Sequence, residues 1–283
     1  MTAQTVSTTE RTVSRMAKGM PTQDGAGVSL SRIIGSPYMQ RVDPFLMLDE
    51  FKSDDPNDYI AGFPFHPHRG FETVTYLIEG SVRHRDHMGN EGYLGPGSIQ
   101  WMTAGKGIIH EEMPQQENGM LWGFQLWVNL PSTDKMCDPR YQDIQAEDIP
   151  ETDFDHGLVR VLAGELNGKV GPVSGVATKP RFFDVRWEED GEFHHELPAE
   201  HTGFIYAYKG TMTVGKQTIQ QGEVAILSAG DSVSIKAEGD SGCLLVAGQP
   251  LSEPVAQYGP FVMNTVEEIE TAIRDFQAGR LTD

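Results

Sequence analysis

The sequence predicts an all-β protein of two jelly-roll β-barrels in tandem, followed by a short C-terminal helix. Gly 31 and Pro 17 are scattered along the 283 residues, which is typical of many short strands joined by tight turns. The two halves also share strand–turn units, since YLIEGSV in the first half is similar to AYKGTMTV in the second, and GPGSIQWMTAG is similar to QGEVAILSAG. Repeated units at this spacing predict two related barrels.

The predicted domain boundaries follow from this repeat. Residues 1–141 are expected to form a metal-binding N-terminal barrel, and residues 158–283 a second barrel that ends in the helix. The acidic stretch QDIQAEDIPETDFDHG, residues 142–157, is expected to connect them.

The C-terminal helix has its own sequence signature. Thr265 followed by Glu268 fits a capping box, in which each residue satisfies a free amide of the first turn. An apolar stripe at helical spacing then runs to about Ala278, formed by Val266, Ile269, Ile273 and Phe276. We expect this helix to cover a barrel surface.

Composition excludes several classes of function. Lys+Arg 22 against Asp+Glu 41 gives a net charge of −19, without the clustered cations that bind phosphates, so direct nucleic-acid binding is not expected. No run approaches the ~20 apolar residues of a membrane span. The first twenty residues lack the apolar stretch of a signal peptide, which predicts a cytoplasmic protein. Cys137 and Cys243 are expected to be buried or half-buried thiols without a disulfide.

Two short motifs carry the chemistry. His66 and His68 lie in FHPHRGFETVTYLIEG, and His110 and Glu112 lie in WMTAGKGIIHEEMP. Side chains two residues apart on a strand point to the same face, so each pair aims two ligands in one direction. Three imidazoles and one carboxylate suit one divalent transition metal, and Fe(II), Mn, Ni and Cu fit this ligand set nearly equally. A six-coordinate iron would keep one or two positions open for substrate or dioxygen.

Longer strings resemble a known family. HPHRGFETVTYLIEG, DPFLMLDEF, GSIQWMTAGKGIIHEEMP, GFQLWVNLP and YGPFVMNT are similar to the pirin family of the cupin superfamily, from about Arg32 to the C-terminal helix. The resemblance implies a bicupin in which His66, His68, His110 and Glu112 hold one metal, usually iron. General cupins take their carboxylate from the first motif, so Glu72 stays an alternative ligand or a hydrogen-bonding neighbour of a histidine.

The repeat also predicts that the second barrel lacks a metal. Aligning Gly80 with Gly210, and Gly105 with Gly230, identifies the positions equivalent to the four ligands. Glu196, Pro198, Ile235 and Ala237 stand there, and one of these four can donate to a metal. Three nearby histidines do not repeat the ligand spacing and are expected to lie on the surface: His194, His195 and His201.

Other polar residues near the two motifs are expected to have roles other than binding the metal. His84 and His87 lie in a charged, turn-rich string and are expected to be solvated. Arg69 is expected to face away from the metal and pair with a carboxylate. Gln125 and Trp127 share one face of a predicted strand, where they line the pocket or fill the core. Three apolar residues are expected in the cavity wall: Phe71, Trp101 and Met102.

The family resemblance implies two functions of different classes. Several bacterial pirins are assigned quercetin 2,3-dioxygenase activity, and a flavonol offers adjacent hydroxyl and carbonyl oxygens that chelate such a metal. Glu112 would then be the catalytic base that takes the 3-hydroxyl proton before dioxygen cleaves the heterocycle and carbon monoxide leaves. Other pirins are iron-dependent regulators that act on a protein partner, such as a transcription complex or a metabolic enzyme.

Overall fold

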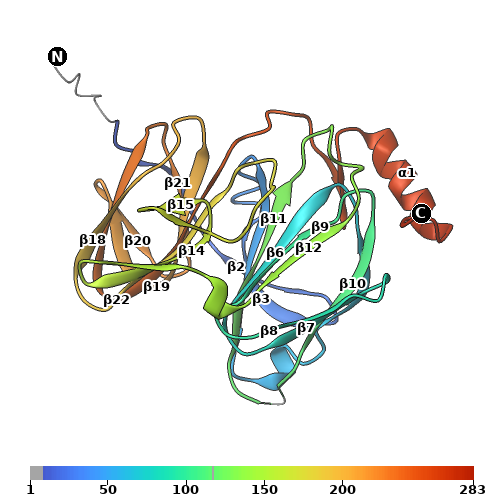
Figure 1. Cartoon of the computed structure of the whole chain (residues 1–283), viewed down its shortest axis with the longest axis horizontal. Helices are drawn as coiled ribbons and strands as arrows, with labels where there is room; N and C mark the ends of the chain where they lie inside the picture. The colour runs from blue at the N-terminus through green and yellow to red at the C-terminus, as the bar shows by residue number, and fades with distance from the viewer. Residues whose placement is uncertain (1–8, 117) are drawn as a thin grey trace. The chain divides into compact units, whose positions relative to one another are not determined.

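The computed structural model describes residues 9–116 and 118–283, and the chain forms two compact β-rich units. The expectation about a signal peptide concerned the first twenty residues, of which residues 1–8 lie outside the described residues. The all-β class, the two barrels and the C-terminal helix are confirmed. Figure 1 shows the strands of each unit and the helix α1 (Val266–Gln277).

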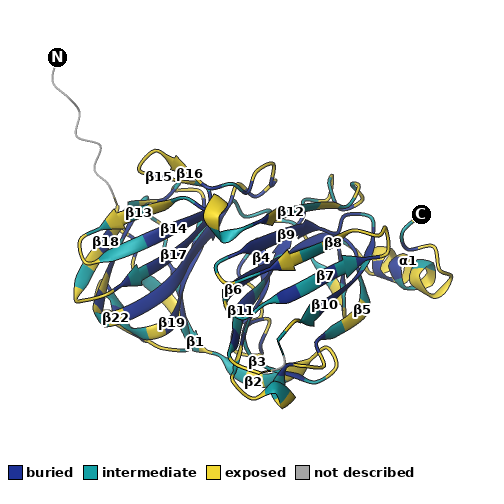
Figure 2. Cartoon of the chain, turned by 60° about the horizontal axis from the view of Figure 1, so that its bottom comes forward, coloured by how far each residue is buried: buried dark blue, intermediate teal, exposed yellow. Residues whose placement is uncertain are grey.

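The N-terminal unit is built from two antiparallel sheets. The seven-stranded sheet has the order β12-β9-β6-β11-β4-β3-β2, and the four-stranded sheet has the order β5-β10-β7-β8. The strands of the larger sheet are β2 (Met20–Asp24), β3 (Val28–Ile34), β4 (Phe45–Ser53), β6 (Phe71–Glu79), β9 (Ile99–Thr103), β11 (Leu121–Asn129) and β12 (Arg140–Ile144). Those of the smaller sheet are β5 (Phe63–His68), β7 (Val82–Asp86), β8 (Glu91–Leu94) and β10 (Ile108–Pro114). Most residues within β4, β6 and β9 are buried (Figure 2).

The C-terminal unit is one nine-stranded sheet around an apolar core. The main order is β1-β21-β19-β22-β17-β14-β13, with β18 paired to β22 and β20 paired to β19. Its strands are β1 (Val13–Lys18), β13 (Glu151–Phe154), β14 (Gly157–Ala163), β17 (Arg181–Trp187), β18 (Gly191–Glu196), β19 (Thr202–Val214), β20 (Gln217–Gln220), β21 (Glu223–Leu227) and β22 (Ser232–Gly248). This unit also contains the short pair β15 (Glu165–Leu166) and β16 (Lys169–Val170).

The N-terminal unit contains the short pair β23 (Ala256–Tyr258) and β24 (Phe261–Met263), and the 3₁₀ turns Pro56–Asp58 and Ala146–Asp148.

The units differ from the predicted boundaries because each contains a segment from the opposite end of the sequence. The stretch that ends at Lys18 belongs with residues 150–250, since β1 pairs with β21. Residues 251–283 belong with residues 19–149. The predicted linker 142–157 is not a separate connection either. Its first residues end β12 and its last residues form β13 and begin β14, so the chain changes unit between Ile149 and Pro150.

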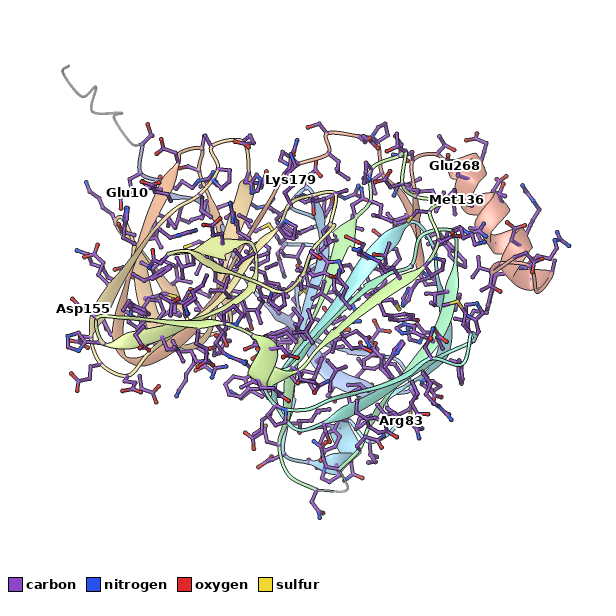
Figure 3. All side chains as sticks on the ribbon, in the orientation of Figure 1. Glu10, Arg83, Met136, Asp155, Lys179 and Glu268 are labelled. Carbon is purple, nitrogen blue, oxygen red and sulfur yellow. The ribbon has the colours of Figure 1, made fainter. Side chains whose placement is uncertain are left out.

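The C-terminal helix begins and ends as its sequence signature predicts. Thr265 accepts a hydrogen bond from the Glu268 amide, and the Glu268 carboxylate accepts one from the Thr265 amide, which completes the capping box. Figure 3 labels Glu268 at the start of α1. Ile269 and Ala272 are buried in a cluster with Phe261 and Leu281, whereas Val266 and Phe276, both part of the predicted stripe, are exposed. The helix covers the N-terminal unit rather than the second barrel, to which the predicted boundaries assigned it.

Two further sequence expectations concern cysteines and membranes. Cys137 is half-buried, Cys243 is buried, and both are free thiols, as expected. Within residues 9–116 and 118–283, none of the helices combines the length and apolar character that crossing a bilayer requires.

Candidate metal centre

Two neighbouring strands position the three histidines. His110 on β10 pairs directly with His66 on β5, and Ile108 pairs with His68 in the same antiparallel ladder. Directly paired residues of an antiparallel ladder share a face of the sheet, and His68 shares that face because it follows His66 by two residues. The three imidazoles therefore converge inside the N-terminal barrel, as the two motifs predict.

The imidazoles are close enough to share one ion. One nitrogen from each of His66, His68 and His110 lies within 4.8 Å of the others, and this is the metal-competent cluster found among the described residues. The ring centroids are separated by 4.4–4.9 Å. Burial, together with the neighbouring histidines, lowers the pKa of His68 and of His110 well below its ordinary value. His68 and His110 are therefore neutral imidazoles, which is the form that binds a metal.

Unsatisfied buried nitrogens show that the cluster fits a metal. Both ring nitrogens of His68 and the Nε2 atom of His110 are buried without a hydrogen-bond partner. Buried polar atoms are normally hydrogen-bonded, and an isolated one costs about 1–3 kcal/mol. A coordinated ion would remove this cost at one nitrogen of His68 and at Nε2 of His110, because the lone pair of each neutral ring would then face a cation.

Hydrogen bonds to the remaining nitrogens select the tautomer that metal binding requires. His66 Nδ1 lies 2.8 Å from the Pro64 carbonyl oxygen, which can only accept, so Nδ1 carries the proton and Nε2 keeps the lone pair that a metal binds. His110 Nδ1 lies 3.0 Å from His84 Nε2. If His110 Nε2 binds the ion, its Nδ1–H donates to His84.

Glu112 follows His110 by two residues but is not part of the group whose ligand atoms lie within 4.8 Å of one another. Its carboxylate faces the cavity that His66 and His68 line. Its Oε1 atom lies 2.7 Å from the Thr75 hydroxyl, and its Oε2 atom accepts a hydrogen bond from Gln125 Nε2 at 3.3 Å. The Thr75 hydroxyl also lies 2.6 Å from Gln125 Oε1, so it has one hydrogen for two acceptors. Thr75 and Gln125 are register partners on β6 and β11 and thereby fix the carboxylate at the cavity wall.

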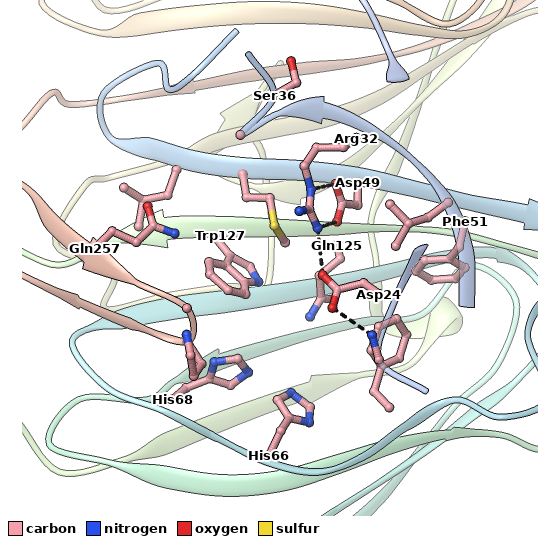
Figure 4. A pocket seen from close by; sticks show the side chains of 18 of the residues that line it. Asp24, Arg32, Ser36, Asp49, Phe51, His66, His68, Gln125, Trp127 and Gln257 are labelled. Atoms are coloured by element: carbon pink, nitrogen blue, oxygen red, sulfur yellow. Dashed lines mark hydrogen bonds and ion pairs between the residues drawn. The ribbon is translucent and has the colours of Figure 1, made fainter. Parts of the chain in front are cut away.

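A cavity of about 1080 Å³ extends from the histidines (Figure 4). His66, His68 and Glu112 lie at one side, and Gln125 and Trp127 line the wall beside them. The sequence did not distinguish whether Gln125 and Trp127 line the pocket or fill the core. Both residues line the pocket. The apolar wall includes Leu30, Leu46, Met47, Phe51 and Phe63.

An ion pair between half-buried Arg32 and buried Asp49 lies across the cavity from the histidines. Arg32 donates to both carboxylate oxygens of Asp49, at 3.0 and 2.7 Å, and to Asp24 at 2.8 Å (Figure 4). Burial raises the pKa of Asp49 to about 6, although the hydrogen bonds from Arg32 oppose that shift. The cavity therefore combines a metal-competent end with a polar, charged far wall.

Comparison with known proteins identifies the family. The pirin model matches residues 27–128, and the model of the pirin C-terminal cupin domain matches residues 182–282. A pirin-like protein of Caulobacter vibrioides is 47% identical over 95% of this chain and 99% of its own length. The chain belongs to the pirin family. Human pirin is 44% identical over 90% of this chain and 88% of its own length. A quercetin 2,3-dioxygenase structure from Acinetobacter baumannii superposes with a TM-score of 0.90 at 35% identity, covering 96% of this chain and 99% of that one.

Three residues of this pirin-family site occupy positions that differ from expectation. Phe71 packs on His68 and Trp127, behind the cavity lining. Trp101 and Met102 are fully buried, and neither is among the residues that line the cavity. The expected apolar wall therefore exists but is built mainly from β3, β4 and β5.

Glu72, the alternative ligand, points away from the histidines. The chain breaks strand geometry at Arg69 and Gly70, between β5 and β6, so the alternation that starts at His66 does not continue to Glu72. Glu72 lies on the opposite face of β6 from Thr75, and its Oε1 atom accepts a hydrogen bond from Thr103 at 2.7 Å. Burial raises the pKa of Glu72 to about 7.

His84 is buried beside the histidine cluster, although the sequence interpretation expected it to be solvated. It is 1% exposed, whereas His87 is exposed as expected. His84 lies on β7, directly opposite Glu112 in the ladder between β7 and β10. The signal was present in the alternation of Val82, His84 and Asp86, all three buried, but the arginines between them suggested a solvated turn.

Arg69 pairs with a carboxylate, as expected, and the partner lies on the C-terminal helix. Its guanidinium donates to Asp275 at 2.8 Å, to the Leu281 carbonyl at 2.8 Å and to the Lys106 carbonyl. Arg69 directly follows the second histidine of the HxH motif. The helix thereby anchors the corner at which β5 leaves the metal centre.

A second buried cation holds the same corner. Lys135 is 1% exposed, and burial lowers its pKa to about 8. Its ammonium donates to Gly70 O, Asn129 Oδ1 and Val262 O at 2.7–3.0 Å, which satisfies all three of its hydrogens.

The positions in the second barrel that correspond to the ligands do not converge on a polar site. Ile235 and Ala237 belong to the apolar core of the C-terminal unit, and Glu196 is exposed. Of the nearby histidines, His194 is exposed as expected. His201 is buried, and His195 is half-buried against Phe183, where burial lowers its pKa to about 4.

We predict that His84→Phe weakens metal binding. The substitution keeps an aromatic ring but removes the acceptor for His110 Nδ1–H, and loss of such a partner typically costs roughly 10–100-fold in metal affinity. Competitive titration of the metal-free protein with a chelator measures this effect. His87→Phe, three residues away and exposed, is the matched control. Equal affinities in the two variants would contradict the role of His84.

Proposed function

We propose that this protein is a metal-dependent dioxygenase that cleaves a flavonol such as quercetin. The supporting observation is the buried three-histidine cluster with unpaired nitrogens, open to a cavity of about 1080 Å³. Sites for drug-sized ligands commonly span roughly 300–1,000 Å³, so a three-ring flavonol fits this volume. Similarity to the Acinetobacter baumannii quercetin 2,3-dioxygenase supports the same reaction class.

His66, His68 and His110 are the proposed ligands, with Glu112 as the fourth. Three neutral imidazoles and one carboxylate leave a divalent ion with net positive charge, and we propose Fe(II) as that ion, with Mn, Ni, Cu or Zn as alternatives. A bound Fe(II) supplies a Lewis acid for the adjacent hydroxyl and carbonyl oxygens of a flavonol and a redox centre for dioxygen.

Glu112 is the proposed general base. Its carboxylate faces the cavity next to the histidines, where it can take the 3-hydroxyl proton of a flavonol. Thr75 and Gln125 hold the carboxylate in this position. Trp127 and Phe63 provide flat apolar surface for the aromatic rings, and the pair of Arg32 and Asp49 offers a donor and an acceptor for peripheral hydroxyls.

Turnover of quercetin by protein of known metal content tests the proposal. We expect iron-loaded protein under air to bleach the flavonol and release carbon monoxide in step with dioxygen uptake, because cleavage of the heterocycle consumes one dioxygen per flavonol. The metal-free protein is the control. Absence of dioxygen uptake with full iron occupancy would favour the other class of function, an iron-dependent regulator that acts on a protein partner.

A further inference from the structure

Arg32 keeps one guanidinium nitrogen free for a ligand. A guanidinium carries five N–H donors. Its Nε atom donates to one oxygen of Asp49, and the two hydrogens of Nη2 go to the other oxygen of Asp49 and to Asp24. The two hydrogens of Nη1 have no partner among residues 9–116 and 118–283. Because Arg32 lines the large cavity, these two donors are available to a molecule inside it.

Two carboxylates fix the direction of the free donors. Asp49 is buried and accepts through both of its oxygens, and Asp24 takes the second hydrogen of Nη2. A planar guanidinium that is held at Nε and at Nη2 cannot rotate, so Nη1 keeps one orientation before a ligand enters. The donors of Arg32 are therefore preorganised.

Gln257 brings a second polar side chain to the same cavity. It lies on β23, in the C-terminal segment that belongs to the N-terminal unit, and it lines the cavity. Its amide offers one acceptor oxygen and two N–H donors, and within the described part of the chain none of them has a hydrogen-bond partner. Figure 4 shows Arg32 and Gln257 on either side of the indole ring of Trp127. The cavity thus presents an aromatic face with unpaired polar groups around it.

A phenolic hydroxyl group matches these polar groups. Its oxygen can accept from Arg32 Nη1, and its hydrogen can be donated to the amide oxygen of Gln257. A ligand that carries only C–H groups at this end would displace water from both side chains and leave them unpaired, which weakens binding. A few polar groups of this kind give a mostly apolar pocket its specificity.

We propose that Arg32 and Gln257 form a subsite that recognises a phenolic hydroxyl at the end of the substrate away from the metal. The inference rests on the proposed function, because the chelating oxygens of a flavonol would occupy the histidine end, and Arg32 lies across the cavity from it. The subsite narrows the substrate class to flavonols that carry a further hydroxyl group, on either the fused ring or the phenyl ring.

Ligands that differ by one hydroxyl group test the subsite without turnover. 3-Hydroxyflavone carries the chelating oxygens alone, whereas 3,7-dihydroxyflavone and 3,4′-dihydroxyflavone each add one hydroxyl, at opposite ends of the molecule. We expect one of the two to bind iron-loaded protein about 10-fold more tightly than 3-hydroxyflavone, because a hydrogen bond from a charged donor contributes at least that much. Titration in the absence of dioxygen, followed by flavonol absorbance, measures each Kd.

Two variants should remove this hydroxyl gain. In Arg32→Lys the three hydrogens of the ammonium match the three carboxylate oxygens that Arg32 binds, so the ion pair stays and no donor is left for a ligand. Gln257→Leu alters an exposed side chain and removes the amide. The matched controls lie in the C-terminal unit and should keep the gain: Arg186→Lys, which alters a comparable pair with buried Asp184, and Gln217→Leu at an exposed position. The gain is a ratio within each variant, so a general change of the cavity cancels.

The subsite and the proposed function can fail separately. Flavonol turnover without a hydroxyl gain in the wild-type protein, or a gain that persists in both Arg32→Lys and Gln257→Leu, overturns the subsite. A gain that depends on Arg32, in iron-loaded protein that takes up no dioxygen with these flavonols, supports the subsite and overturns the proposed dioxygenase. Absence of any flavonol binding overturns both.

Discussion

Protein that carries His66→Ala and His68→Ala should lose its metal. The wild-type protein should contain one ion per chain, because the N-terminal unit brings three imidazoles together and the corresponding positions of the C-terminal unit include two apolar core residues. Removing two of the three ligands should weaken affinity by more than the roughly 100-fold upper range for loss of a hydrogen-bonded neighbour. Elemental analysis after dialysis measures the content directly.

Thermal unfolding separates metal loss from misfolding. A metal that binds only the folded state stabilises it by about 2.7 kcal/mol when its free concentration is 100 times Kd. Wild-type Tm should therefore rise on addition of metal, and the Tm of the double variant should not. His87→Ala with His194→Ala, two exposed histidines, is the control and should respond like wild type. Two tightly held ions per wild-type chain, or an ion retained by the double variant, would contradict this assignment.

Glu112→Gln should abolish flavonol turnover, with a fall of at least about 100-fold, because a general base contributes roughly 10²–10⁴-fold. Metal affinity should also decrease, since an amide is a weaker ligand than a carboxylate. Glutamine is nearly isosteric and keeps an acceptor for the Thr75 hydroxyl. The measurements are bound iron and dioxygen uptake per folded protein.

The neighbour Glu111 provides the matched comparison, although it is buried rather than exposed on the surface. Strand alternation directs it to the opposite face of β10, and there its carboxylate accepts from Arg85 at 2.7 Å and lies 3.4 Å from Arg83. Because both arginines are partly exposed, Glu111→Gln should cost about 0.5–1 kcal/mol of stability. Turnover per folded, iron-loaded protein should stay at the wild-type level.

Glu72→Gln completes the set of variants. Glu72 accepts from Thr103 on the face of β6 away from the histidines, so its amide variant should keep both metal and turnover. Loss of the ion from Glu72→Gln, together with its retention in Glu112→Gln, would transfer the carboxylate ligand to Glu72. Equal losses at Glu111 and Glu112 would contradict the strand register of β10.

The sequence predicted the direction of the histidine pair within β5, because that geometry is local. The spacing His66-x-His68 depends only on strand alternation, whereas the meeting of His110 with His66 also requires β5 to pair with β10 in the observed register. The bulge between His110 and Glu112 shifts the register against β5 but leaves Glu112 facing the cavity. Two-residue spacing is therefore a reliable guide within one strand.

The same reasoning failed where the strand was misjudged or interrupted. His84 was assigned to a solvated turn because flanking arginines dominate its string, yet those arginines occupy the outer face of a regular strand. Glu72 was compared with His68 across Gly70, whose positive φ of 87° interrupts the strand and its alternation. Strand alternation predicts which face of the sheet a side chain points to only as far as the strand continues without interruption.

The domain boundaries could not be predicted from local pattern, because they depend on pairing between distant segments. β1 joins β21, about two hundred residues later in the chain, through the ladder from Val13 to Lys18. The sequence of a strand carries information about its facing but very little about its partner. The repeat therefore predicted two barrels correctly and assigned both terminal segments to the other unit.

The exchange of terminal segments has a consequence for biosynthesis. Arg69 and Lys135 are buried cations, and their acceptors at Leu281, Val262 and Asp275 are translated only after the whole C-terminal barrel. While the nascent chain is incomplete, the β5–β6 corner lacks these acceptors, and neither cation can be buried at low cost. A metal is therefore expected to enter only once residues 251–283 have docked on the N-terminal unit. Synthesis of this segment is thus expected to precede assembly of the candidate metal centre.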